Sequence, residues 1–341
     1  MAALLAAGVM SLGALSACGS SGGSDSSGSG SGDGLKVGMA YDVGGRGDQS
    51  FNDSAAAGLD KAKKDLGIET QESEAVDGEA ESAREERLRT FADAGYNPVI
   101  AVGFAYSASV AKVAKEYPDI DFAIIDDEEA KGDNIANLVF AEEQGSFLVG
   151  AAAALKTKSN EVGFVGGVET PLIQKFEAGY VAGAKAVKPD ITVDTTYLSQ
   201  PPDFSGFGDP AKGKTAAQGM YDKGADVVYH AAGGSGGGVF EAAKSANKLA
   251  IGVDSDQYKT VDASLRSVIL TSMLKNVDVA VYNYLKSASE GDIPTGVRRY
   301  DLKVGGVDYS TSGGQVDDIK SKLDDYKQQI IDGKITVPTK P

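Results

Sequence analysis

Three short apolar segments constrain the fold of this chain more than any other feature of its sequence. They are VIAVGF (99–104), DFAIID (121–126) and LAIGVD (249–254). An almost continuous apolar run of this length is typical of a strand that is buried on both faces of a parallel sheet. Because helical patterns lie between such runs, the sequence predicts βαβ units and an α/β fold with doubly wound sheets.

Strands and helices are expected to alternate along the rest of the body. The first helix is expected to be capped by Asn52 or Asp53 and to end at Gly67, which suits a helix C-terminus. The other predicted helices are 79–94, 107–117, 144–155, 173–187, 210–223, 238–247, 277–287 and 317–331. The predicted strands are 35–41, 68–72, 99–104, 121–126, 161–166, 191–198, 226–230, 249–254, 267–270 and 299–304.

The length of 341 residues favours two domains of ordinary size. Two of the buried strands, one in each half of the chain, end in an acid, which suggests two sheets that face each other across a cleft. The segments after 256 are too few for a core of their own and are expected to be shared, so that several crossings form a hinge. The expected lobes are 35–128 plus 257–294 and 129–256 plus 295–341.

The N-terminal residues are typical of a bacterial lipoprotein. Residues 2–17 form an uncharged run rich in Ala, Leu and Gly, as in the apolar region of a signal peptide. The run ends in Leu-Ser-Ala-Cys, which matches a lipobox with Cys18 as the acylated residue. Residues 19–34 contain no apolar side chain and suit a flexible tether. The sequence therefore predicts a signal peptide (1–18), a linker (19–34) and a lipid-anchored protein on the outer face of the cell membrane.

Composition and motifs argue against several classes of function. The chain has 33 basic and 49 acidic residues, and this net charge of −16 disfavours nucleic acid or an anionic membrane surface as a partner. One histidine and one cysteine leave no credible transition-metal site. The segment 233–237 matches G-x-S-x-G, but His230 precedes the serine, opposite to the order in that hydrolase fold. The glycine-rich segments also lack the spacing of phosphate-binding loops. We expect no cofactor and no catalysis.

The segment LKVGMAYDVGGRGDQSFND (35–53) reads as a strand, a glycine-rich loop and the start of a helix. This arrangement places Asp42 at the carboxyl end of a strand and Phe51 at a helix N-terminus, where open α/β sheets bind ligands. An acid and an aromatic ring suit a flat, polar, uncharged molecule better than a phosphate. Structural alternatives remain: Phe51 could be a hydrophobic staple, and strand-end acids such as Asp42, Asp126 and Asp254 are commonly turn or cap residues.

Several longer segments, in this order, resemble one family. They are YDVGGRGDQSFND, YPDIDFAIID, GGVETPLIQKFEAGYVAGAK, FGDPAKGK, AAGGSGGGVFEAAK and IGVDSDQ. They resemble the basic membrane protein (BMP) lipoproteins, the PnrA-like purine-nucleoside-binding components of ABC transporters. The resemblance implies a type I periplasmic-binding-protein fold, with two Rossmann-like lobes that carry parallel sheets and are joined by a multi-strand hinge.

The resemblance also implies roles for single residues. Phe51 and Phe207 correspond to the rings that stack on the two faces of the purine, although Phe204 lies close to Phe207 in the sequence and is an alternative. Base stacking of this kind is worth about 1–3 kcal/mol per ring. The polar contacts are implied for the base by Asp42, Asn52 and Asp126, for the ribose hydroxyls by Asp254 and Lys275, and for the sugar by the backbone at Gly234.

The function expected from residues and resemblance together is that of a monomeric solute receptor. It would capture a purine nucleoside such as guanosine, inosine or adenosine and deliver it to an ABC permease, without catalysis. Two alternatives stay open. A receptor of the same fold could bind a sugar or an autoinducer, because clefts with aromatic rings and carboxylates also hold sugars. An extracellular nucleoside hydrolase is the alternative from a different class.

Overall fold

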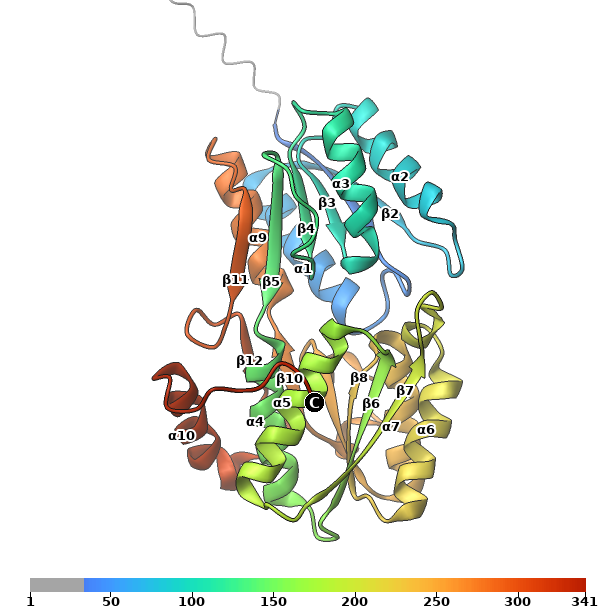
Figure 1. The fold of residues 1–341 in the computed structure, drawn as a ribbon, viewed down its shortest axis with the longest axis vertical. Helices are drawn as coiled ribbons and strands as arrows, with labels where there is room; N and C mark the ends of the chain where they lie inside the picture. Colours follow the sequence, from blue (N-terminus) through green and yellow to red (C-terminus); the bar gives the residue numbers. More distant parts are fainter. Residues whose placement is uncertain (1–33) are drawn as a thin grey trace, which may run out of the picture. The chain divides into compact units, whose positions relative to one another are not determined.

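The structure is a computed structural model that describes residues 34–341 (Figure 1). Its strands are β1 (Lys36–Tyr41), β2 (Glu69–Glu74), β3 (Val99–Val102), β4 (Phe122–Ile125), β5 (Ile135–Phe140), β6 (Glu161–Val168), β7 (Thr192–Ser199), β8 (Val227–Ala231), β9 (Leu249–Asp254), β10 (Ile269–Lys275), β11 (Gly296–Tyr300) and β12 (Val307–Tyr309). The α-helices are α1 (Phe51–Leu66), α2 (Glu81–Asp93), α3 (Ser107–Glu116), α4 (Glu142–Lys156), α5 (Pro171–Val187), α6 (Pro210–Lys223), α7 (Gly236–Ala246), α8 (Gln257–Thr260), α9 (Val277–Ser289) and α10 (Lys320–Ile331).

Within residues 34–341 the strands form two six-stranded sheets. The first has the order β11-β5-β4-β3-β1-β2 and is parallel throughout. The second has the order β12-β10-β9-β8-β6-β7 and is parallel except for the pairing of β10 with β12. We call the first sheet with α1, α2, α3 and α9 lobe 1, and the second sheet with the other helices lobe 2. The predicted α/β class with two parallel sheets is confirmed.

The chain passes between the lobes three times within the described residues, after β5, after β10 and after β11. The strands at these crossings occupy the same edge of their sheets, with β11 and β5 at the edge of lobe 1 and β12 and β10 at the edge of lobe 2 (Figure 1). This edge forms the hinge. At the opposite edge lie β2 and β7, which are far from every crossing.

The sheets differ from the expected lobe boundaries at three strands. β5 lies within 129–256 but pairs with β4 of lobe 1. β10 was expected in lobe 1 with 257–294 but pairs with β9 of lobe 2, and β11 was expected in lobe 2 with 295–341 but pairs with β5. The expected boundaries 35–128 and 257–294 are therefore corrected. The chain crosses between the lobes after β5, β10 and β11, which lie at the hinge side of the sheets, and not after the central strands that end in an acid.

Glycines allow α4 and α5 to pack with their backbones in close approach. A Cβ atom at Gly150 would lie 2.1 Å from the carbonyl oxygen of Tyr180, and one at Gly183 would lie 1.9 Å from that of Phe147. Any side chain at these positions would force the helices apart. This packing holds α4, which follows the first crossing, against the C-terminal half of α5.

Among residues 34–341, no helix is both long enough and apolar enough to cross a lipid bilayer. The predicted signal peptide, Cys18 and the tether up to residue 33 lie outside the described residues.

Candidate functional site

A pocket between the lobes contains seven of the eight predicted binding residues. Lobe 1 contributes Asp42, Phe51, Asn52 and Asp126, and lobe 2 contributes Phe207, Asp254 and Lys275. The eighth, Gly234, lies beside this lining, and its neighbour Gly233 belongs to it. Gly233 has a φ of 54°, and a Cβ atom there would lie 3.1 Å from the carbonyl oxygen of Phe207, so the turn brings Gly233 rather than Gly234 to the pocket wall.

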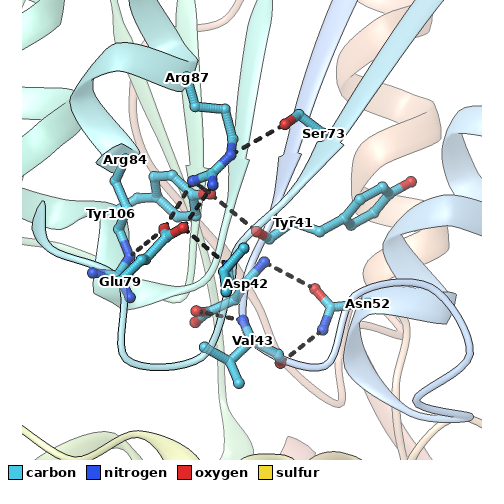
Figure 2. Close-up of polar contacts among 10 residues, drawn as sticks. Tyr41, Asp42, Val43, Asn52, Ser73, Glu79, Arg84, Arg87 and Tyr106 are labelled. Carbon is cyan, nitrogen blue, oxygen red and sulfur yellow. Dashed lines mark hydrogen bonds and ion pairs between the residues drawn. The ribbon is translucent and has the colours of Figure 1, made fainter. Parts of the chain in front are cut away.

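The loop between β1 and α1 holds Asp42 and Asn52 against each other. The side-chain oxygen of Asn52 accepts a hydrogen bond from the backbone N–H of Asp42 at 3.2 Å, and Asp42 Oδ1 accepts one from the N–H of Val43 at 2.7 Å (Figure 2). Burial raises the pKa of Asp42 to about 6, although the Val43 N–H and the charge of Arg84 oppose the shift. Asp42 is therefore a buried acceptor that begins to take up protons close to neutral pH.

The side chain of Asp48 organises the start of α1. Its Oδ1 accepts from the N–H groups of Ser50 at 2.8 Å and Asp53 at 3.1 Å, and its Oδ2 accepts from the N–H of Asn52 at 2.8 Å. The N-cap position is Ser50, so the expected cap at Asn52 or Asp53 is wrong: both lie inside the first turn. The true capping carboxylate comes from earlier in the loop, which leaves Phe51 and Asn52 at the pocket.

The two strand-end acids share an unusual backbone conformation. Asp126, after β4, has a φ of 68°, and Asp254, at the end of β9, has a φ of 62°. Residues other than glycine rarely adopt this left-handed region, and such positions cluster at functional sites. Asp254 Oδ2 accepts a hydrogen bond from the hydroxyl of Ser50 at 2.6 Å, so it already contacts lobe 1.

Lys275 is a buried cation at the base of the pocket, with a side chain only 1% exposed. Its Nζ lies 2.5 Å from Asp126 Oδ2 and 3.2 Å from Glu142 Oε1, so its ion-pair partners are these acids rather than Asp254. Burial alone would lower the pKa of Lys275, but the negative charges of Asp126, Glu142 and Asp254 outweigh burial and raise the pKa. Burial likewise raises the pKa of Asp126, opposed by the charge of Lys275. Lys275 thus joins β10 of lobe 2 to the end of β4 in lobe 1.

Aromatic rings from both lobes line the pocket. The ring centroid of Phe51 lies 5.1 Å from Lys275 Nζ, while Phe207 belongs to a short 3₁₀ turn after β7. Phe104, which follows β3, also lines the pocket and meets Phe207 edge-to-face at 6.4 Å. Phe204 lies outside the lining, and it contacts Phe104 at 5.8 Å. Between the two alternatives from the sequence, Phe207 is therefore the ring at the pocket.

Sequence reasoning missed Asp48, Phe104 and Glu142. Asp48 and Phe104 line the pocket, and Glu142 is fully buried behind Lys275. The sequence signal for Phe104 was present, since this residue ends the apolar run VIAVGF at the carboxyl end of a buried strand. Glu142 carried no such signal, because its contact with Lys275 depends on the crossing between the lobes.

The G-x-S-x-G segment has a structural role. The hydroxyl of Ser235 is fully buried, donates to the carbonyl oxygen of Gly206 at 2.7 Å and accepts from the N–H of Asp209 at 2.8 Å. His230 is also buried, its Nε2 lies 3.0 Å from the amide oxygen of Gln257, and burial lowers its pKa to about 4. Ser235 and His230 therefore contact other residues of the fold and not each other.

Two α/β lobes that are hinged at one edge and enclose a pocket define a solute-binding protein of the type I periplasmic class. The Bmp family, described as "ABC transporter substrate-binding protein PnrA-like", matches residues 35–340. The chain therefore belongs to the Bmp family of ABC transporter substrate-binding proteins. Membership of this family implies a small-molecule ligand, a permease partner and an extracytoplasmic location.

Individual proteins agree with this assignment. The chain is 38% identical over 321 residues to the CD4+ T-cell-stimulating antigen of Listeria monocytogenes, covering 89% of this chain and 88% of the relative. It is 37% identical over 326 residues to the ABC transporter nucleoside-binding protein BmpA of Lactococcus lactis, covering 90% of each. A solved ABC transporter solute-binding protein from Aeropyrum pernix has a TM-score of 0.77 and 31% identity, covering 89% of this chain and 93% of that one.

Proposed function

We propose that this protein captures purine nucleosides between its lobes and delivers them to an ABC permease. The observation that carries the proposal is the pairing, in one pocket, of aromatic rings from opposite lobes with a set of buried carboxylates. Phe51 would stack on one face of the purine and Phe207 on the other. Each base–ring contact of this kind contributes about 1–3 kcal/mol.

The polar groups suit the remainder of a nucleoside. Asp42, Asn52 and Asp126 would contact the base, and Asp126 offers a buried Oδ1 without a hydrogen-bond partner among the described residues. Asp254 and Lys275 would hold the ribose hydroxyls, with backbone contacts from the turn at Gly233 and Gly234. Hydrogen bonds from hydroxyls to a carboxylate are charge-assisted and stronger than bonds to a neutral acceptor.

The charges of the pocket favour a ligand without a phosphate. Four carboxylates line it, from Asp42, Asp48, Asp126 and Asp254, against the single lysine at position 275. That lysine is already paired with Asp126 and Glu142. A nucleotide would bring further negative charge into a buried acidic site, whereas a nucleoside brings N–H and O–H donors.

Binding would act through closure of the lobes. The proposed contacts come from both lobes, so a ligand would stabilise the closed form by its differential affinity for that form. The Lactococcus lactis relative, which carries the words "nucleoside-binding" in its name, supports the choice of ligand. Acylation of Cys18 and the Gly/Ser tether would hold a monomeric receptor at the outer face of the membrane, with two or more acyl chains for stable anchoring.

Isothermal titration calorimetry tests the proposal. Inosine, guanosine and adenosine are expected to bind, whereas ribose alone, a free sugar such as arabinose and inosine 5′-monophosphate are expected to bind at least ~10-fold more weakly. Phe51→Ala should weaken nucleoside binding by about 10–100-fold. Tyr282→Ala, which removes a ring on α9 outside the pocket lining, is the matched control and should leave affinity unchanged.

Three results would contradict the proposal. Tighter binding of a sugar than of any nucleoside would favour the sugar receptor. Equal affinities of the Phe51→Ala and Tyr282→Ala variants would remove the stacking role. Release of free base during incubation with inosine, measured by chromatography, would identify a hydrolase instead of a receptor.

A further inference from the structure

A contact between the lobes lies beside the pocket, on the side away from the hinge, and it joins the pocket-lining ring of Phe104 to residues outside the lining. Phe104 of lobe 1 meets Phe204 of lobe 2 edge-to-face, with ring centroids 5.8 Å apart and an interplanar angle of 61°. The guanidinium carbon of Arg84, in α2 of lobe 1, lies 5.9 Å from the centroid of the same Phe204 ring. Phe204 is thus held by an aromatic edge and a cation, both from the other lobe.

Arg84 is well placed for such a cation–π contact. Its side chain is 8% exposed, and its guanidinium lies between the rings of Tyr106 and Phe204, 5.9 Å from each centroid. Its Nε lies 3.6 Å from Glu79 Oε1 and has no hydrogen-bond partner among the described residues. Cation–π contacts are strongest where the cation has little access to water, and this side chain is largely buried.

The neighbouring Arg87 differs from Arg84 in its partners, although both belong to α2. Arg87 donates two hydrogen bonds to the carboxylate of Glu79, at 2.9 and 2.7 Å, and others to Tyr106 and Ser73 (Figure 2). All of these partners belong to lobe 1. Arg87 therefore satisfies the carboxylate of Glu79 within the lobe, which leaves Arg84 to face Phe204.

The position of these residues makes their contact sensitive to opening. α2 follows β2 and Phe204 follows β7, and both strands lie at the sheet edges opposite the three crossings (Figure 1). A rotation about the hinge moves this edge furthest. Edge-to-face and cation–π contacts are lost within a few ångströms, so even a small opening separates Arg84 and Phe104 from Phe204.

We propose that Arg84, Phe104 and Phe204 form an interlobe clasp that stabilises the closed lobes and sets how long a ligand stays bound. Arg84 and Phe204 lie outside the pocket lining, so they act as positioning residues and not as ligand contacts. The clasp opposes opening with or without a ligand. Only its effect on ligand release rests on the proposed nucleoside binding.

Stopped-flow kinetics with inosine measure the effect on release. Arg84→Ala and Phe204→Ala should each accelerate dissociation by about three- to twenty-fold, because each removes the cation–π contact. The association rate should change by less than ~2-fold. Because the two residues act on each other, the double variant should dissociate little faster than the faster single variant.

Arg89→Ala is the matched control. Arg89 lies on the same helix, but it bonds Glu116 and Glu85 of lobe 1, at 2.7 and 2.9 Å. Its replacement should leave dissociation unchanged. If Arg84→Ala does not fold, as judged by circular dichroism, Phe204→Leu takes its place. Equal dissociation rates for the Arg84 and Arg89 variants, or fully additive effects in the double variant, would overturn the clasp.

A second measurement needs no ligand. Spin labels at Val76→Cys and Gln200→Cys, in a Cys18→Ser chain, report the distance between the lobes near the clasp. Arg84→Ala should increase the population at long distance, whereas Arg89→Ala should not. Identical distance distributions for both variants would overturn the proposal. If no nucleoside binds to the wild-type protein, the proposed function fails while this measurement still decides the clasp.

Discussion

Replacement of Lys275 by methionine tests the electrostatics at the base of the pocket. Lys275 is the cation between Asp126 and Glu142, whose side chains are 5% and 1% exposed. Removing one partner of a buried ion pair leaves an uncompensated charge and typically costs about 3–5 kcal/mol. Methionine preserves most of the volume and the contacts with the surrounding rings of Phe51 and Phe140.

The sign of the pH dependence follows from the carboxyl of Asp126, whose pKa is raised by burial and lowered by the charge of Lys275. Without Lys275 its folded-state pKa must rise further above that of the unfolded chain, because burial remains and the attraction is lost. A carboxyl whose pKa is raised in the folded state lowers the free energy of unfolding as the pH rises through that pKa. The free energy of unfolding of Lys275→Met should therefore fall below wild type by about 3–5 kcal/mol at pH ~8, and by much less at pH ~5.

Urea denaturation at both pH values, followed by far-UV circular dichroism, measures this difference. Lys175→Met is the matched control: Lys175 lies 3.7 Å from Glu142, but its side chain is 24% exposed, so its loss should cost under about 1 kcal/mol. The reasoning would be refuted if Lys275→Met lowered the free energy of unfolding no more than the control does, or lowered it more at pH ~5 than at pH ~8.

Three further predictions concern single positions. Burial raises the pKa of Asp42 from 3.8 to about 6, so the charged carboxylate destabilises the folded state above that pH. Asp42→Asn should therefore raise the free energy of unfolding by about 1–3 kcal/mol at pH ~8, measured by urea titration, and should weaken nucleoside binding in calorimetry. Asp254→Ala should weaken nucleoside binding by about 2–4 kcal/mol, and unchanged calorimetric affinity would remove its role at the sugar. Gly150→Ala, whose new Cβ would lie 2.1 Å from the carbonyl oxygen of Tyr180, should lower the free energy of unfolding by at least about 1–3 kcal/mol, and an unchanged urea midpoint would contradict the close packing of α4 on α5.

The central strands could be predicted because strands buried on both faces consist of continuous apolar runs in the sequence. β3, β4 and β9 lie within the predicted segments, and their residues are almost all buried. β5 was not predicted, because Asn137 interrupts its apolar run. In the structure Asn137 is buried and its amide donates to the carbonyl oxygen of Ala130 at 3.0 Å, a contact that local sequence cannot reveal.

The missed strand also explains the misplaced lobe boundaries. Without β5, the chain was expected to leave lobe 1 after residue 128, whereas one more strand follows before α4. β12 and the full length of β10 were missed for a related reason. Strands at the hinge edge are defined by the partner that they pair with, and the periodicity of their own residues does not specify that partner.

The candidate site was predictable where the chain supplies it locally. Acids at the carboxyl ends of parallel strands lie where such sheets bind ligands, which is why Asp42, Asp126 and Asp254 could be singled out from the sequence; their binding roles came from the family resemblance. Glu142 and the pairing of Lys275 with Asp126 depend on how the two sheets face each other. These contacts could not be derived from spacing, because the residues lie on different sheets or beside a crossing.

Three chain crossings at a single edge favour one relative motion of the two lobes, a rotation about that edge. Twisting or sliding of the lobes would strain all three connections at once. A ligand that stabilises the closed form would therefore shift the lobes along this single rotation. A membrane partner that contacts the outer rims of both halves would need to distinguish only two spacings, loaded and empty, without touching the cargo. Recognition of the molecule and recognition of its carrier can consequently diverge in sequence independently of each other.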